Sequence, residues 1–126
     1  MNLEAVHTDS APRAIGPYSQ AVAVGSFVFC SGQVALDPQS GEIVGVTAAE
    51  QAVQAMDNLS AVVAAAGSSM DRVVRTTIFL QSMDDFGTVN EVYAGYFSAV
   101  KPARATVAVK TLPKNALVEV DCIAVR

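Results

Sequence analysis

The chain has 126 residues, of which 52% are hydrophobic and 16% are charged, and its net charge is −4. This composition is too apolar and too weakly charged for a disordered protein, and the length predicts one domain over residues 1–126. The eight Lys and Arg residues are scattered, so no basic stripe indicates a nucleic-acid partner. No apolar run is long enough for a bilayer and residues 1–13 do not resemble a secretory signal, which predicts a cytoplasmic protein without a membrane partner.

The apolar fraction also exceeds what a small monomer needs, which favours a surface buried against other subunits. The two cysteines, Cys30 and Cys122, lie far apart in apolar, strand-like runs. We expect them to be buried free thiols, because disulfides are rare in a reducing compartment. His7 is the single histidine and has no ligand-type residue at metal-binding spacing, so the sequence predicts no metal site.

The first half of the chain predicts a hairpin followed by a helix. Gly25 and Ser26 separate two β-rich runs, which is typical of a two-residue turn. Thr47 and Glu50 form a capping-box pattern at a helix start, and Gly67 is the expected stop. The predicted elements are a strand over 5–8, a loop over 10–18, strands over 20–24 and 27–33, a turn over 37–41 and a helix over 47–67 with an apolar stripe of Val53, Met56, Leu59 and Val63.

The second half predicts a strand, a second helix and two further strands. Ser82 can cap the start of the helix, and two aspartates in its first turn interact favourably with the helix dipole. Pro102 is expected to end the helix. The predicted elements are a strand over 72–81, a helix over 82–100 with a stripe of Phe86, Val89, Tyr93, Tyr96 or Phe97, and Val100, and strands over 105–110 and 117–126. This order predicts an α+β fold with a mixed sheet and both helices on one face.

One charge lies in each of the last two predicted strands, Arg104 before an Ala/Val run and Glu119 inside another. Strand residues alternate between the two faces of a sheet. If the helices cover the apolar sets 105/107/109 and 118/120/122/124, then Arg104 and Glu119 are expected on the helix-free face. The simpler interpretation is an exposed salt bridge of little energetic value. The functional one is that Arg104 grips a small carboxylate and Glu119 orients a water, in a cleft between subunits.

Several ordered motifs point to a known family. They are "AIGPYSQAV" at 14–22, "SGQVALDPQSGEIVG" at 31–45, "FGTVNEVYAGYF" at 86–97 and "PARATVAVKTLPKNALVEVD" at 102–121. With these motifs the chain resembles, almost end to end, the reactive-intermediate (enamine/imine) deaminases, the YjgF or RidA family. The whole of 1–126 would then be a single RidA-like deaminase domain.

The resemblance implies a chorismate-mutase-like α+β fold, with a mixed six-stranded β-sheet and two α-helices packed on one face. It implies a homotrimer with clefts between subunits. It also implies hydrolytic deamination of 2-aminoacrylate and 2-iminobutyrate intermediates to 2-keto acids and ammonia, as a repair of metabolite damage. No cofactor is implied, because the imine carbon is already electrophilic.

The resemblance also assigns roles to individual residues. Arg104 would clamp the substrate carboxylate and Glu119 would position the attacking water. Tyr18 would contact the substrate through its hydroxyl, while Ser31 and Gly32 would offer hydroxyl and backbone groups near the imine. Each of the last three has a plainer alternative, as a packed loop tyrosine or a strand-end turn.

Asn90 matches a family asparagine near the cleft, although at its helical spacing it could equally be structural. Two positions depart from the family. Lys101 stands where an aromatic residue is usual, and Thr106 stands where cysteine is frequent. Thr106 should share the face of Arg104 and line the cleft, which puts any thiol chemistry there in doubt.

Alternatives to the deaminase remain open from the sequence. One is a regulatory trimer that binds a small carboxylate without turnover. Endoribonuclease, translation-inhibitor and chaperone-like roles have also been ascribed to the family. The ribonuclease role fits poorly, because the chain is acidic and His7 has no visible partner.

Overall fold

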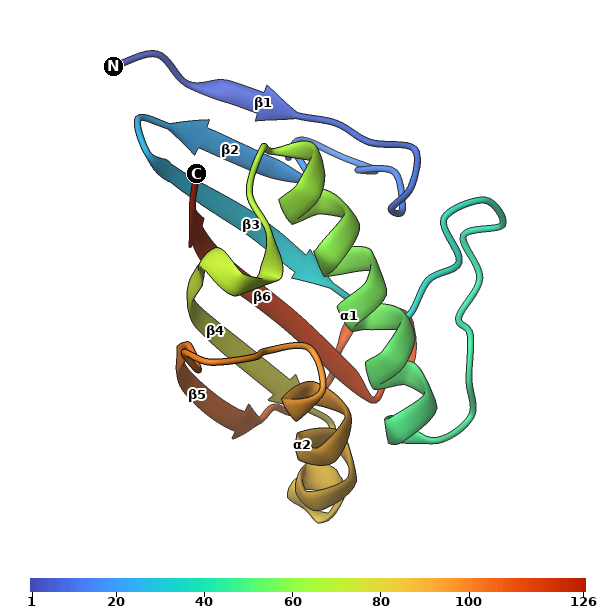
Figure 1. Ribbon diagram of the computed structural model, residues 1–126. Coiled ribbons are helices and arrows are strands. Elements are labelled where there is room, and N and C mark those ends of the chain that lie inside the picture. The colour runs from blue at the N-terminus through green and yellow to red at the C-terminus, as the bar shows by residue number, and fades with distance from the viewer.

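The strands form one mixed sheet in the order β1-β2-β3-β6-β4-β5, with the helices on one of its faces (Figure 1). The computed structural model describes all residues, 1–126. Only β4 and β5 run parallel; the other pairs are antiparallel. The strands are β1 (Glu4–Val6), β2 (Ala21–Val24), β3 (Phe27–Gln33), β4 (Val73–Leu80), β5 (Ala103–Ala108) and β6 (Val118–Val125), and the helices are α1 (Ala48–Ala65) and α2 (Phe86–Ala94). The predicted six-stranded α+β fold is confirmed.

Helix α1 begins as its capping box predicts. The Thr47 side chain accepts from the Glu50 amide, and the Glu50 carboxylate accepts from the Thr47 amide. Met56 is buried as expected, together with Leu59 and Val63, but the prediction that Val53 belongs to the same stripe is wrong, because its side chain is 44% exposed. Ala52 takes that place, since a small side chain lets the helix lie close to the sheet.

Helix α2 is shorter than predicted. It follows a 3-10 turn at Met83–Asp85, capped by the Ser82 hydroxyl, and ends at Ala94 rather than just before Pro102. After Ala94, the amides of the next three residues bond to carbonyls three residues back instead of four, so tight turns replace the regular helix. Val100 is consequently 77% exposed, so its assignment to the apolar stripe is wrong.

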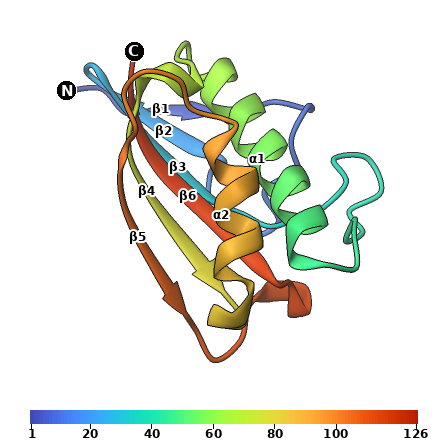
Figure 2. The same cartoon turned by 60° about the horizontal axis from the view of Figure 1, so that its bottom comes forward.

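Strand β6 separates the two faces of the sheet as the alternation predicts. Its even positions, from Val118 to Ala124, are buried beneath the helices, and its odd positions, including Glu119 and Asp121, lie on the helix-free face. Cys122 pairs with Cys30 of β3, and both are buried free thiols, as predicted. Figure 2 shows the two helices side by side over the same face of the sheet.

Strand β5 has the opposite orientation from the predicted one. Arg104 lies beside Thr76 of β4, and Thr76 lies beside Cys122 of β6, so all three side chains point to the helix face. The prediction that Arg104 and Glu119 share the helix-free face is therefore wrong. The alternation of residues could not decide the orientation of β5, because Ala or Val occurs on both of its faces. In the structure Val107 lies on the face opposite Arg104, and it is 44% exposed.

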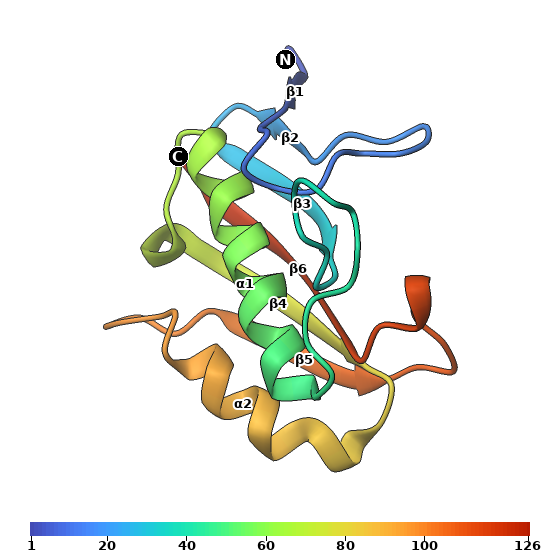
Figure 3. The same cartoon turned by 90° about the vertical axis from the view of Figure 1, so that its right-hand side faces the viewer.

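The edges of the sheet carry the connections that matter for the site. Figure 3 shows α2 running along the β5 edge and the segment before β2 extending beyond the sheet. The β2–β3 hairpin turns at Gly25, whose φ of 58° suits glycine, and Val24 pairs with Phe27 as predicted. No helix combines the length and apolar character needed to span a bilayer.

Candidate active site

The first cavity, called here the glutamate cavity, encloses about 710 Å³. It lies between the segment before β2, the end of β3 and the start of β6. Four of the residues that the resemblance singles out line it together: Tyr18, Ser31, Gly32 and Glu119. The fold therefore brings together, from three separate segments, four residues that the sequence singled out.

A β-bulge places Ser31 and Gly32 beside Glu119. The β3–β6 pairing runs from Cys30 opposite Cys122 to Gln33 opposite Val120, so β3 holds one extra residue in this interval. Bulges of this kind re-aim side chains and occur next to active sites. A Cβ added at Gly32 would lie only 2.9 Å from Cδ of Glu119, so the missing side chain of Gly32 is the space that the carboxylate occupies.

The carboxyl group of Glu119 is half-buried and forms no ion pair. Burial raises its pKa above the usual value, and the nearby negative charge of Asp121 raises it further. A carboxylate with a raised pKa is a better proton acceptor than an exposed one. Glu119 is thus suited to act as a base toward a bound water.

The loop that carries Tyr18 is held in place by hydrogen bonds to side chains on both sides. The Ser31 hydroxyl donates to the Ser19 carbonyl at 2.6 Å, so it anchors this loop. The buried amide of Gln20 accepts from the Thr8 amide at 2.7 Å and donates to the Pro12 carbonyl at 2.8 Å. Tyr18 itself is 53% exposed and lines the mouth of the glutamate cavity.

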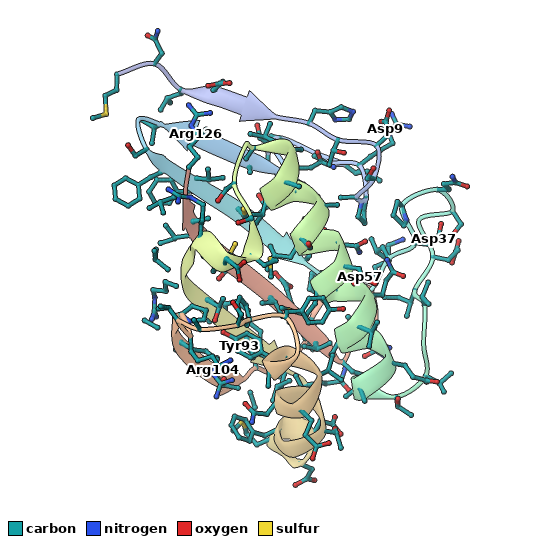
Figure 4. The ribbon with its side chains drawn as sticks, viewed as in Figure 1. Asp9, Asp37, Asp57, Tyr93, Arg104 and Arg126 are labelled. Carbon is teal, nitrogen blue, oxygen red and sulfur yellow. The ribbon has the colours of Figure 1, made fainter.

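The second cavity, called here the arginine cavity, encloses about 390 Å³ between α2 and β5. Its lining includes Asn90, Tyr93, Lys101 and Arg104. Figure 4 shows Tyr93 and Arg104 close together between these two elements. This cavity lies on the helix side of the sheet, at the β5 edge.

Arg104 is held by three residues of α2. Its Nη1 donates to Asn90 Oδ1 at 2.7 Å, and its Cζ lies 4.9 Å from the ring centre of Tyr93 and 5.6 Å from that of Phe86. Such cation–π contacts fix the guanidinium plane and leave most of its N–H donors unused. Tyr93 is fixed in turn, because its buried hydroxyl hydrogen-bonds with Thr76 Oγ1 at 2.7 Å.

Thr106 shares the strand face of Arg104, as predicted, and its Oγ1 is buried without a hydrogen-bond partner. It does not line either of the two cavities. Within one chain, Arg104 and Glu119 thus remain apart, in separate cavities on opposite faces of the sheet. The salt bridge between them that the simpler interpretation predicts is wrong, since the ion pairs are His7–Asp9 and Arg126–Glu4.

Four lining residues with a cationic or phenolic side chain were not assigned to the site from the sequence. Arg13 and Lys114 lie at the glutamate cavity, and Tyr93 and Lys101 at the arginine cavity. Tyr93 could have been found from the sequence, because it follows Asn90 by one helical turn. Lys101 was noted only as a departure from the family, and Arg13 and Lys114 had no signal, because segments outside the regular strands bring them to the cavity. No group of three or more His, Cys, Asp or Glu side chains is arranged to hold a metal.

Comparison with known proteins places this geometry in a family. The family profile described as "Endoribonuclease L-PSP" matches residues 8–126. The chain belongs to this RidA/YjgF/L-PSP family. The predicted resemblance is confirmed, since the match spans nearly the whole chain.

Among the relatives of this RidA-family chain, one is named for an activity and another has a bound ligand. A mouse protein named 2-iminobutanoate/2-iminopropanoate deaminase is 50% identical over 121 residues, which are 96% of this chain and 90% of the mouse protein. Escherichia coli TdcF, whose crystal structure has bound serine, is 42% identical in sequence to this chain, and the two structures superpose with a TM-score of 0.93 over 98% of each chain. RidA from a Psychrobacter species is 41% identical with a TM-score of 0.94, over 98% of this chain and 99% of that one. The chorismate-mutase-like α+β fold is confirmed.

Proposed function

We propose that this protein hydrolyses 2-imino acids, and the enamines that tautomerise to them, into 2-keto acids and ammonia. The observation that carries the proposal is the 50% identity, over nearly the full length of both chains, to a protein named for this activity. 2-Aminoacrylate and 2-iminobutyrate, which dehydratases release, would be among its substrates. The role would be the removal of reactive intermediates before they damage other enzymes.

The proposed site is completed by a second copy of the chain in a homotrimer. In a cyclic trimer each interface joins two different surfaces, so the arginine cavity of one subunit can face the glutamate cavity of the next. The exposed apolar residues of the helix-free face support this assembly, since Phe27, Phe29 and Val107 remain 48%, 46% and 44% exposed in a single chain. Burial of that face would form the core of the trimer.

In this cleft, Arg104 receives the substrate carboxylate. Its fork of N–H groups matches the two carboxylate oxygens, and Asn90 and Tyr93 hold the fork in one orientation. Binding of the carboxylate fixes the neighbouring imine carbon near the second subunit. The attack of water is then effectively intramolecular. Tyr18 would contact the same substrate through its hydroxyl.

Glu119 of the second subunit then activates water. Its carboxylate accepts a proton as the water oxygen bonds to the imine carbon, and the C=N π electrons move to nitrogen. The protonated Glu119 returns the proton to the amine nitrogen of the tetrahedral intermediate. The Glu119 carboxylate then takes the hydroxyl proton and passes it to the nitrogen as the C–N bond breaks, so that the bond electrons leave with ammonia and the keto acid remains. The imine needs no cofactor as an electron sink, because its carbon is already electrophilic.

A coupled assay tests the proposal. Threonine dehydratase generates 2-iminobutyrate in place, and formation of the keto acid is followed with and without this protein. We expect acceleration by the wild type and a loss of roughly 100-fold or more in Arg104→Ala, because the substrate is no longer positioned. No acceleration by a correctly folded wild-type protein would contradict the proposal.

The plainest alternative is a trimer that binds a small carboxylate without turnover. Calorimetric binding of 2-ketobutyrate, combined with no acceleration in the assay, would favour it. An endoribonuclease has less support, although the family description carries that word. The chain is acidic, and His7 is exposed and hydrogen-bonds only with Asp9.

A further inference from the structure

The arginine cavity contains two cationic side chains and no acidic one. Lys101 and Arg104 both line it, beside uncharged residues of α2. Neither forms an ion pair, since the ion pairs of the chain involve His7 and Arg126. Two uncompensated positive charges in one cavity of about 390 Å³ are suited to a ligand with more than one negative charge.

Lys101 is held at the wall of this cavity. Its Nζ donates to the Phe97 carbonyl at 2.9 Å and to the Ser98 carbonyl at 2.8 Å, in the segment that follows α2. An ammonium group has three N–H donors, so one remains free after these two bonds. These two carbonyls lie beyond the last residue of α2, and their bonds hold the ammonium group beside the cavity.

Arg104 alone is sufficient for a substrate with one carboxylate. Five N–H donors belong to its guanidinium, and the hydrogen bond to Asn90 Oδ1 uses one of them. A single carboxylate engages two more in the bidentate geometry that arginine favours. The positive charge of Lys101, which is exposed in a single chain, then has no anionic partner in the cavity, so a second carboxylate adds a contact that an apolar side chain cannot make.

We propose that Lys101 determines substrate specificity by binding a second anionic group, so that the preferred substrates are 2-imino dicarboxylates. This inference rests on the proposed function, since it assigns a substrate class to the same cleft. The α-carboxylate lies on Arg104 and the side-chain carboxylate on Lys101. The imine carbon between them stays accessible to the water held by Glu119 of the neighbouring subunit.

The test compares two imines of equal chain length that differ in the second carboxylate. Amino-acid oxidases generate them in place from glutamate and from norvaline, and kcat/KM is measured for each. We expect the wild type to favour the glutamate-derived imine by roughly tenfold or more, as for one hydrogen bond to a charged group. Lys101→Met should lower this ratio toward one by reducing the rate on the dicarboxylate, and Lys101→Arg should retain it.

A matched control removes a positive charge elsewhere. Lys110 is exposed and lines neither cavity, so Lys110→Met should leave the ratio unchanged. An equal fall for both imines in Lys101→Met would show that Lys101 acts only as a cap for the end of α2 and would overturn the inference. So would a wild type that prefers the norvaline-derived imine, although the proposed function would then stand. Acceleration of neither imine would contradict the proposed function itself.

Discussion

At the scale of single residues, Gly32 and Glu119 depend on one another. The carboxylate of Glu119 occupies the space that any side chain at position 32 would need. Its pKa is raised because it is held in this half-buried position near Asp121. The same placement that makes Glu119 a useful base also makes its charge costly to bury, as is common where function and stability compete.

Replacing Gly32 with alanine should displace the Glu119 carboxylate and leave the fold intact. The new Cβ meets the end of a flexible side chain rather than backbone, so the side chain can move. We expect turnover to fall by roughly 100-fold or more, as when a general base is lost. Thermal unfolding should change little.

The control is Gly87→Ala, where nothing lies within 4 Å of an added Cβ. This glycine belongs to α2, so alanine should keep activity and slightly stabilise the helix. Full activity in Gly32→Ala would mean that the position of the Glu119 carboxylate does not matter for the reaction.

The ionisation of Glu119 gives a prediction for stability. Because its pKa is raised on folding, the ionised group disfavours the folded state, and this cost grows as the pH rises through the folded pKa. Glu119→Gln should therefore be inactive but more stable than the wild type at neutral pH. Below the usual glutamate pKa the two proteins should be equally stable, because Glu119 is then protonated in both the folded and the unfolded state.

Urea unfolding of the wild type and Glu119→Gln across this pH range measures the difference. The activity of the wild type should fall as the pH drops through the raised pKa, since only the carboxylate accepts a proton. Asp121→Asn should move that limb of the pH profile to lower pH, because the Asp121 charge contributes to the raised pKa. A stability gap that is the same at all pH values would contradict the assigned cause.

At the scale of secondary-structure elements, the contact between α2 and β5 determines where the arginine points. Asn90 and Tyr93 come from one face of α2, and Arg104 comes from the edge strand beside it. We therefore propose that Asn90 positions Arg104, a role that the sequence alone left undecided between cleft and structure.

Asn90→Asp tests this contact with a change of one atom. An aspartate would pair with Arg104 and compete with the substrate carboxylate, whereas alanine would only loosen the guanidinium. We expect KM to rise in both variants, by roughly tenfold or more in Asn90→Asp, as for a charged hydrogen bond. If KM in Asn90→Asp equals that of the wild type, then the substrate carboxylate does not bind at Arg104.

The same elements show how far sequence reasoning reached. The capping box, the hairpin and the two faces of β6 were predicted, because each depends on a few neighbouring residues. The orientation of β5 was not, because its Ala and Val occupy both phases and the aromatic face of α2 attracts Arg104. The early end of α2 was missed for a similar reason, since the Lys101 bonds that stabilise the segment after it are not visible as a pattern.

At the scale of the whole molecule, the proposed site is divided between two cavities of one chain. The residues of the glutamate cavity and those of the arginine cavity were predicted as one site, and a single chain holds them on opposite faces of its sheet. Sequence could indicate which residues matter, but not that they would be divided, because that depends on how copies of the chain assemble. The proposed trimer brings the two halves together.

Subunit complementation tests this central claim most directly. Arg104→Ala and Glu119→Gln subunits, each inactive alone, are unfolded and refolded together in equal amounts, and native mass spectrometry verifies that mixed trimers form. If each cleft takes Arg104 from one subunit and Glu119 from the next, roughly a quarter of the clefts should regain both residues, and activity should return to that level. Mixed trimers that remain as inactive as their parents would contradict a site shared between subunits.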